Sequence, residues 1–466
     1  MTMINVTIIG AGPSALFSAK TILENSNAIS VEILEQGVVQ SSRSCPADSG
    51  KCQNCSSCAT LEGIGGAGLF SDGKLVLDLT SGGKADGVSS LTTSEQHSLE
   101  EHIKETFVSF DGVSEAKLKP SEEVQDSIVS SFLEKNLEIK FYNVLHMGTK
   151  NLQNITTNFV SYLTQHFENR FKIKAETTAL SINREKSIYS VVTNRGIIYA
   201  DVVITAVGKS GAQWLKETLS PIGCTFIDHD FYFGVRMETQ AEHIKDFVEY
   251  SFDPKIHRVT SGRKVKVHCV CKNGEIRYSR HRNALVVGGH SPYTKNNNSH
   301  NSSINANFNV LLSFNKQSFP VESLLSAFRT ENENSVVVQK LSDFIKNQCS
   351  ENFGSVVPSN PSMVHFGNIR SIMDLLDLKF SEIVIQFLQS IAELHPGIMR
   401  DDNLLYAPAI EWDMDTVKVN KHMETELENL FAIGDGAGIS QGIVYSSSTG
   451  IIAAREIVAR FEGENT

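Results

Sequence analysis

Residues 4–15 read INVTIIGAGPSA, an apolar strand that runs into a glycine turn and then into a helix. Residues 430–438 read LFAIGDGAG, a second apolar strand that ends in Gly434-Asp435-Gly436 with a helix-like segment behind it. A nucleotide pyrophosphate needs a turn of bare backbone and the positive end of a helix, and a polyol chain needs a carboxylate acceptor. The two ends of the chain therefore predict a single site on a sheet to which both contribute.

The first turn opens a βαβ unit. Apolar residues recur at helical spacing after it, and SVEILEQ (30–36) follows as the second strand. Gly10 allows the tight turn, Gly12 lets the backbone approach a pyrophosphate, and Ala15 takes the place of the third glycine. Glu35 lies 25 residues after Gly10, close to the offset of about 20 residues at which an acidic side chain reaches the adenosine ribose. FAD lying across the sheet accounts for both ends of the chain, and a glycine turn in another kind of α/β protein is the alternative.

The length of 466 residues exceeds a single hydrophobic core, so we expect two domains. The fold class predicted is α/β, with a Rossmann-like FAD-binding domain assembled from N-terminal, middle and C-terminal segments and an inserted α+β substrate domain. The predicted boundaries are 1–81 for the first FAD-binding segment, 82–142 for a helical insertion, 143–215 for the second segment, 216–404 for the substrate domain and 405–466 for the C-terminal segment. In the substrate domain we expect strands near 231–237, 265–271 and 284–289, and helices near 322–347 and 379–394.

Charge and hydropathy exclude several classes of partner. The net charge is −11, from 42 Lys and Arg against 53 Asp and Glu, which argues against a nucleic acid or an acidic membrane as the partner. The first strand begins by Met3, which leaves no room for a cationic leader, and no uncharged run reaches the roughly 18 residues of a spanning helix. We therefore expect a soluble, cytoplasmic protein that acts on a small molecule.

Four of the eight cysteines fall within fourteen residues, at Cys45, Cys52, Cys55 and Cys58. The Cys-x2-Cys-x2-Cys spacing lets successive thiolates bind one iron–sulfur cluster, and four thiolates would equally satisfy a tetrahedral zinc ion. Redox-active thiols and a loop without metal are the alternatives. The sequence leaves these three interpretations open.

Several motifs together resemble a known family. GAGPSA with Glu35, ADVVITAVGKSG (200–211) and LFAIGDGAG resemble the glutathione-reductase-type FAD fold. More narrowly, a further set of motifs is similar, in this order, to a bacterial group of FAD-dependent dehydrogenases whose reactions are largely unassigned. These motifs are RSCP (43–46), CQNCSSC (52–58), GIGGAGLFSDGKL (63–75), HMGTKNL (146–152), GVRME (234–238) and GISQGIVYSSSTG (438–450).

The resemblance implies roles for individual residues. Arg43 would lie over the phosphates, Asp435 would bind the ribityl chain, and the helix that follows Gly438 would point its N–H groups at the N1–C2=O edge of the flavin. A surface charge for Arg43 and a helix cap for Asp435 are the alternatives. The full set expected to contact FAD is Gly10, Gly12, Pro13, Ser14, Ala15, Glu35, Arg43, Gly65, Gly66, Gly68, Gly208, Gly434, Asp435, Gly442 and Ile443.

Two residues are candidates for catalysis. His146, expected at the start of a helix, would face the flavin, although a packing role is the alternative. Arg236 would clamp a substrate carboxylate together with its neighbour Glu238, and a structural ion pair is the alternative. A second strand–GxGxxG–helix unit is missing, because VVGGH (286–290) has no helix signature behind it. NAD(P)H would therefore act only as a diffusible donor.

The function predicted is that of an FAD-dependent oxidoreductase that moves a hydride between a small organic substrate and N5 of the flavin. The direction is open, so dehydrogenase, desaturase and reductase all fit. One alternative is an electron relay to a carrier protein through an iron–sulfur or thiol centre at Cys45–Cys58. The other is a non-catalytic flavin-binding scaffold with a structural zinc loop.

Overall fold

The segment INVTIIGAGPSA forms strand β1 (Ile4–Ile9), a turn and the start of helix α1 (Pro13–Asn25), and β2 (Ile29–Leu34) follows. Pro13 suits the first helical position, where no backbone N–H is needed. The apolar side chains of α1, among them Ala15, Phe17 and Ile22, are fully buried. This βαβ unit is therefore the centre of the first hydrophobic core.

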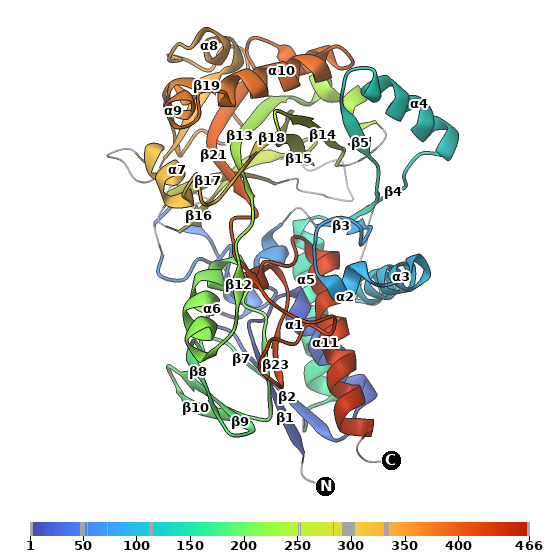
Figure 1. Cartoon of the computed structure of the whole chain (residues 1–466). Helices are drawn as coiled ribbons and strands as arrows, with labels where there is room; N and C mark the ends of the chain where they lie inside the picture. Colours follow the sequence, from blue (N-terminus) through green and yellow to red (C-terminus); the bar gives the residue numbers. More distant parts are fainter. Residues whose placement is uncertain are drawn as a thin grey trace.

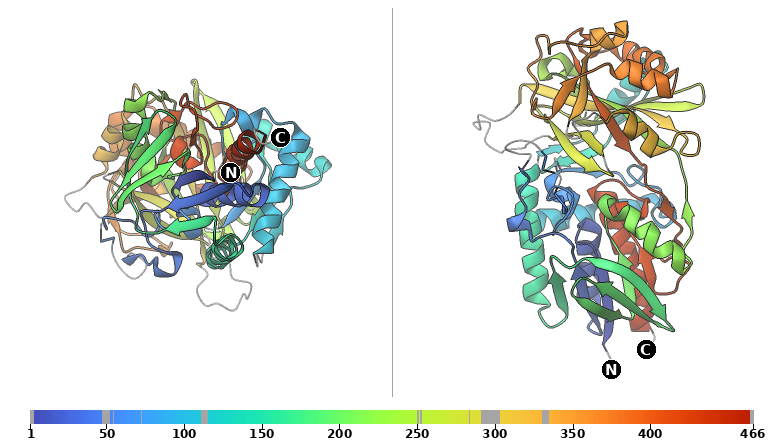
Figure 2. Two further views of the ribbon diagram at one scale, coloured as in Figure 1. Left: turned by 90° about the horizontal axis from the view of Figure 1, so that it is seen from below. Right: turned by 90° about the vertical axis from the view of Figure 1, so that its left-hand side faces the viewer.

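In the computed structural model the chain forms two lobes, and both termini lie at the far end of one of them (Figures 1 and 2). The structure describes residues 3–46, 52–53, 55–71, 73–110, 115–249, 251, 253–282, 284–290, 303–329 and 335–463. The expectation of a mixed α/β fold is confirmed. None of the helices in these ranges combines the length and the apolar character that a membrane span requires.

The first lobe is built on a parallel sheet in the order β23–β11–β1–β2–β7. Three distant parts of the chain supply these strands, because β7 (Phe171–Lys174) and β11 (Val202–Thr205) come from the middle and β23 (Leu430–Ala432) comes from the C-terminal end. An antiparallel layer packs on one side of this sheet and the helices pack on the other (Figures 1 and 2). The layer is β8 (Ala179–Glu185), β9 (Ile188–Thr193) and β10 (Gly196–Ala200), and the helices are α1, α3 (Thr93–Ser109), α5 (Thr149–His166) and α11 (Ile443–Gly463).

The second lobe contains an eight-stranded sheet in the order β20–β19–β21–β13–β18–β15–β14–β5. Its strands are β5 (Glu138–Lys140), β13 (Phe231–Gln240), β14 (Lys255–Thr260), β15 (Arg263–Cys271), β18 (Asn305–Phe314), β19 (Val336–Lys340), β20 (Val364–Phe366) and β21 (Leu404–Glu411). Its helices are α4 (Glu122–Leu133), α7 (Val321–Ala327), α8 (Leu341–Lys346), α9 (Ile369–Leu376) and α10 (Phe380–Ala392). The buried side of α10 packs on this sheet, away from the first lobe (Figure 1).

The rest of the strands and α-helices are smaller elements of the two lobes. They are the strands β3 (Lys74–Leu77), β4 (Glu115–Lys117) and β6 (Asn143–His146), the pair β12 (Phe226–Ile227) and β22 (Thr416–Val417), the hairpin β16 (Glu275–His281) and β17 (Ala284–His290), and the helices α2 (Asp86–Ser89) and α6 (Ala212–Leu219). Two large hydrophobic cores result, one around β1 and α1 and the other around β13, β18 and α10. The large sheet includes all of β21, so it extends past residue 404, and it also takes in β5 from the expected helical insertion.

One expected element is wrong. The predicted helix at 322–347 consists of α7 and α8 with strand β19 between them, and residues 330–334 of it lie outside the described residues. β19 begins with three consecutive valines that are buried within the large sheet. Branching at Cβ favours the strand over the helix, which explains the difference.

Candidate cofactor site and the adjoining cavity

The first glycine turn joins β1 to α1 at the carboxyl edge of the parallel sheet. The backbone N–H of Gly10 donates to the carbonyl of Leu34 at 2.7 Å, and a Cβ at Gly10 would lie 2.3 Å from the carbonyl oxygen of Ala206. Gly12 precedes Pro13 at the start of α1, and outside its chain neighbours a Cβ there would meet no atom closer than 4.0 Å. The turn thus offers bare backbone and a helix N-terminus, which suits a pyrophosphate.

Glu35, at the end of β2, is buried and binds three backbone N–H groups. Its Oε2 accepts from Ala11 at 2.9 Å, and its Oε1 accepts from Gly37 at 2.8 Å and from Gly63 at 2.9 Å. A carboxylate has about four acceptor positions, so one remains for a ribose hydroxyl. The carboxylate therefore holds the loop at 63–66 against the glycine turn, a role that its offset in the sequence did not predict.

Arg43 is also buried, and it organises the same loop. Its Nε donates to the carbonyl of Ala59 at 2.9 Å, and its Nη1 donates to those of Ile64 at 3.1 Å and Gly66 at 2.8 Å. Burial lowers the pKa of Arg43 to about 10, opposed by the charge of Glu35, so the guanidinium stays positive at neutral pH. The alternative of a surface charge is wrong, because the side chain is only 7% exposed.

The loop that Arg43 holds contacts the first residues of helices α1 and α11. The backbone N–H of Gly65 donates to the carbonyl of Ala11 at 2.9 Å, and a Cβ at Gly66 would lie 2.9 Å from Cα of Gly12. A Cβ at Gly68 would be in ordinary contact with Pro13 and Ile443. The predicted residues of this loop are thus brought together with the first turn and with α11.

The second end of the site follows β23. A Cβ at Gly434 would lie 2.7 Å from Oγ of Ser14, so the C-terminal turn packs on α1. Oδ1 of Asp435 accepts from the Ser440 hydroxyl at 2.7 Å, and the backbone N–H of Gly442 also bonds to this carboxylate. Burial raises the pKa of Asp435, and the charge of Lys209 opposes the rise. The carboxylate is placed beside the first turn of α11.

The turn after β11 is the third glycine turn of the candidate cofactor site. A Cβ at Gly436 would lie 2.4 Å from the carbonyl oxygen of Gly208, so these two turns are in contact. A Cβ at Gly208 or at Gly442 would meet nothing within 4 Å, so both positions border open space. Glycine turns from three chain segments, two helix N-termini and one carboxylate therefore surround a space at the carboxyl ends of parallel strands, and these residues fit FAD.

The structure places His146 differently from the prediction. It is the last residue of β6, opposite Lys74 of β3, and α5 begins three residues later at Thr149. The side chain is buried. The expected helical position is wrong, and a part in catalysis stays a prediction.

Arg236 is fully buried within the large sheet. Its Nε donates to Oδ1 of Asn307 at 2.7 Å, its Nη1 to Oδ1 of Asn309 at 2.9 Å and its Nη2 to the carbonyl of Cys269 at 3.0 Å. A Cβ at Gly289 would lie 1.7 Å from Nη2, so Gly289 of VVGGH makes room for the guanidinium beside β17. The environment is that of a structural arginine, and contact with a substrate stays a prediction.

The four clustered cysteines are not gathered as a ligand set. The backbone N–H of Cys52 contacts Sδ of Met363 in the second lobe, whereas Sγ of Cys58 lies 3.1 Å from Oγ1 of Thr60. Within the described ranges, no three side chains of His, Cys, Asp or Glu converge as metal ligands. Residues 47–51 and 54 of this loop lie outside those ranges. The metal stays a prediction, and we derive no chemical step from it.

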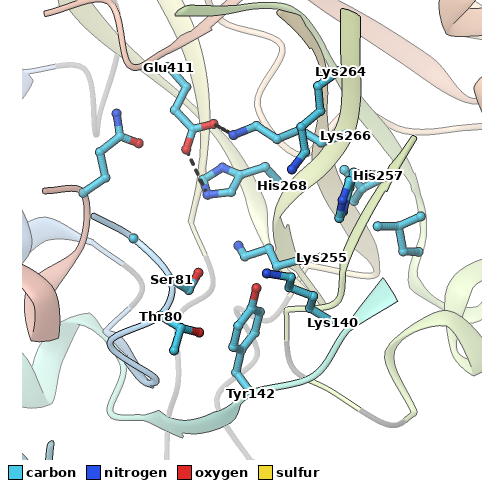
Figure 3. A pocket seen from close by; sticks show the side chains of 14 residues that line it. Thr80, Ser81, Lys140, Tyr142, Lys255, His257, Lys264, Lys266, His268 and Glu411 are labelled. Carbon is cyan, nitrogen blue, oxygen red and sulfur yellow. Dashed lines mark ion pairs between the residues drawn. The ribbon is translucent and has the colours of Figure 1, made fainter. Parts of the chain in front are cut away.

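A cavity of about 220 Å³ lies between the large sheet and the first lobe (Figure 3). Gln441, the residue before Gly442, forms part of its wall, so the cavity adjoins the turn that begins α11. The backbone N–H of Gln441 donates to the carbonyl of Gly82 at 2.6 Å, which ties the two wall segments of the first lobe together. The lining residues are Thr80, Ser81, Gly82, Lys140, Tyr142, Lys255, Ile256, His257, Lys264, Lys266, Val267, His268, Glu411 and Gln441.

Figure 3 shows Glu411 joined to two basic side chains of β15. Its Oε2 lies 2.5 Å from Nζ of Lys266, and its Oε1 lies 3.1 Å from Nε2 of His268. Burial, and then the charges of Lys255 and Lys266, hold the pKa of His268 well below its ordinary value of 6.5. The imidazole is therefore neutral at neutral pH, and the charges in the cavity are those of its lysines and of Glu411.

Sequence reasoning missed this cavity. The signal was present in RKVKVH (263–268), where basic residues alternate with valines, since alternation places every second side chain on one face of a strand. The wall also needs β5, β14 and residues 80–82, which are far apart in the sequence. No local pattern brings these segments together.

Comparison with known proteins supports the cofactor. Residues 230–409 match the family described as FAD-dependent protein, C-terminal domain-like. An uncharacterized protein from Clostridium beijerinckii is 25% identical over 430 residues, which cover 86% of this chain and 70% of that protein. The family match agrees with the expected FAD cofactor and with an FAD-dependent oxidoreductase.

Solved structures similar to this chain include an oxidase and a flavoprotein/dehydrogenase. Glycine oxidase from Geobacillus kaustophilus is 12% identical, with 99% of this chain and 95% of that chain covered and a TM-score of 0.40. A flavoprotein/dehydrogenase from Cytophaga hutchinsonii is 10% identical, with 99% and 79% covered and a TM-score of 0.38.

Proposed function

We propose that this FAD-dependent protein moves a hydride between a small organic substrate in the cavity and N5 of FAD held by the glycine turns. The cofactor supplies the redox chemistry when bound, and the chain supplies its position and the field around it. The proposal includes a glutathione-reductase-type Rossmann arrangement, supported by the parallel sheet assembled from three segments and the antiparallel layer β8–β10. The direction of transfer is left open.

One observation carries the proposal. Gln441 lines the cavity, and the next residue, Gly442, borders the open space beside Asp435. A flavin whose ribityl chain binds Asp435 would lie against the start of α11, where backbone N–H groups stabilise a reduced, anionic ring. A substrate in the cavity would then lie next to the flavin, which hydride transfer requires.

The proposed FAD-binding site is tested by measuring the flavin content of purified variants. Gly12→Val places a branched side chain where the pyrophosphate would lie, and Asp435→Ala removes the ribityl acceptor, so both variants should purify mostly without FAD. Gly288→Val is the matched control, because Gly288 lies in β17 and a Cβ there meets nothing closer than 3.8 Å. Full flavin occupancy in both variants would contradict the placement.

The redox half is tested with the holoenzyme. Any reduction by NADPH should be slow and weakly saturable, because VVGGH lies inside an antiparallel hairpin strand, β17, rather than at a turn from a strand to a helix. Rapid-mixing absorbance of the bound FAD measures this directly. Fast, tightly saturable reduction of the free enzyme by NADPH would show a preformed nicotinamide site and contradict the proposal.

A further inference from the structure

One face of the large sheet carries an unusual concentration of basic side chains. Lys264, Lys266 and His268 alternate along β15, and Lys255 and His257 alternate along the neighbouring β14. Alternate residues share a face, so these five side chains lie on the cavity side, as Figure 3 shows. The intervening residues of these two strands belong to the hydrophobic core of the second lobe. The basic face is therefore fixed by the same alternation that builds the core.

The third strand of this face adds a like charge in register. Lys140 of β5 lies directly opposite Lys255 of β14. Like charges directly opposite one another on paired strands destabilise a sheet. The whole chain carries a net charge of −11, so this cluster is not a consequence of composition.

Carboxylates neutralise only part of the cluster. Lys255 pairs with the buried Asp253, and Lys266 pairs with Glu411 at 2.5 Å. Lys140 and Lys264 have no ion-pair partner in the described part of the chain. Burial lowers the pKa of Lys264, the charges of Lys266 and Lys140 lower it further, and the charge of Glu138, which contacts His257 at 3.1 Å, opposes this lowering. Two lysines thus stand at the cavity outside any ion pair of the described residues.

Uncharged donors complete the lining. Tyr142 is buried and bonds to Ser81, and burial raises the pKa of its phenol, which therefore keeps its proton. Nε2 of Gln441 is buried and has no hydrogen-bond partner within the described ranges. Ammonium, phenol and amide N–H groups are all donors, so the wall is suited to an acceptor-rich ligand.

We propose that the cavity binds a small organic anion whose acidic group is a carboxylate or a phosphate, and that this anion is the substrate. The second part rests on the proposed function. At about 220 Å³ the cavity is smaller than the roughly 300–1,000 Å³ of sites for drug-sized ligands, so the anion is small. Its charge would offset the repulsion that Lys264 experiences from Lys266 and Lys140.

The test is equilibrium dialysis of the holoenzyme against radiolabelled succinate and, separately, against inorganic phosphate at low ionic strength. We expect one of the two anions to bind at one site per chain and the neutral diamide of succinate not to bind. Saturable binding of succinate alone identifies a carboxylate, and saturable binding of phosphate alone identifies a phosphate. Failure of both anions to bind would overturn the proposal.

Two variants locate the site. Lys264→Gln removes a charge that has no ion-pair partner among the described residues, so it should fold, and it should weaken binding about tenfold or more. Lys245→Gln is the matched control, since Lys245 is an exposed lysine paired with Glu242 outside the cavity. Equal affinities for the two variants would overturn the placement of the anion in this cavity.

A spectral measurement separates the anion site from the proposed function. Binding beside the flavin should shift the visible spectrum of bound FAD with the same saturation curve as the dialysis. Binding that leaves the flavin spectrum unchanged would overturn the assignment of the anion as substrate. A protein that binds succinate but purifies without FAD and cannot take it up would contradict the proposed function while supporting the anion site.

Discussion

Among single residues, Gly10 occupies a position that leaves no room for a side chain. Its φ is +102°, and a Cβ would lie 2.3 Å from the carbonyl oxygen of Ala206. We predict that Gly10→Ala lowers the free energy of unfolding by about 2 kcal/mol or more and reduces FAD occupancy. Chemical denaturation and flavin release measure the two effects, with Gly288→Ala as the control. A variant as stable as the wild type would contradict the geometry of the first turn.

Substitutions of Arg43 test whether its guanidinium organises the loop by hydrogen bonds or acts on the cofactor phosphates through its charge. The structure gives it three loop carbonyls as acceptors at 2.8–3.1 Å. A lysine offers a single ammonium and cannot reproduce this fork, so Arg43→Lys should lose nearly as much FAD affinity as Arg43→Met, and both should destabilise the protein by about 2–3 kcal/mol. If Arg43 acts on the phosphates through its charge, Arg43→Lys should retain most of the affinity measured by flavin titration.

The titration of Lys264 gives anion binding a pH dependence. Its pKa is lowered from 10.5, first by burial and then by Lys266 and Lys140, and Glu138 opposes this lowering only in part. The charge of Lys264 is therefore lost at a lower pH than that of an ordinary lysine. Anion affinity should therefore fall as the pH rises toward this lowered pKa, because the neutral amine no longer attracts the anion. The folded state binds the proton less tightly than the unfolded state does, so stability changes in the opposite sense and rises over the same range. Dialysis of wild type and Lys264→Gln across the alkaline range checks this, since the variant should lose most of the dependence.

Residue-level prediction succeeded where a role is local and failed where partners are distant. The positive φ at Gly10 and the position of Asp435 at the end of a buried strand follow from short motifs. The partners of Glu35 include Gly63, twenty-eight residues away, which no offset rule identifies. The burial of Arg43 among loop carbonyls depends on how the segment 59–66 folds back.

At the scale of elements, the cysteine loop can be tested against another exposed thiol of the same chain. Cys55 and Cys349 are both exposed, whereas Cys224 is buried and burial raises the pKa of its thiol. If the loop binds iron or zinc, anaerobically prepared protein should contain metal and Cys55 should be alkylated more slowly than Cys349, because a coordinated thiolate is protected. Metal analysis and mass spectrometry of alkylated peptides measure this. Protein without metal, in which Cys55 and Cys349 react equally fast, would contradict the metal prediction.

Helices and strands were predicted correctly where the local signals agree, and one strand was missed where long-range pairing decides the conformation. The βαβ unit was predictable because glycine, proline and helical periodicity agree over residues 4–36. Strand β19 was missed because its neighbours α7 and α8 continue a helical pattern on either side. Its three valines are buried between β20 and β21, which are contributed by later parts of the chain. The pairing of β19 with strands from distant parts of the chain therefore determines its conformation.

At the scale of the whole molecule, two separate cores predict two unfolding transitions. Phe17 is buried in the first core and Phe387 in the second. Phe17→Ala and Phe387→Ala should each cost about 3–5 kcal/mol, and each should lower a different transition in calorimetry. Added FAD should raise only the transition that Phe17→Ala lowers, because the glycine turns belong to that core. A single transition affected equally by both variants would contradict the two-core organisation.

We propose that FAD lies at the carboxyl edge of the parallel sheet, held by turns from three parts of the chain and next to the cationic cavity. A crystal structure of the FAD-bound protein tests it most directly. We expect pyrophosphate density at Gly10–Gly12 and α1, the ribityl chain at Asp435, and the flavin ring between Gly442 and the cavity lined by Lys255 and Lys266. Flavin density elsewhere in the molecule, or a ring that does not border the cavity, would contradict it.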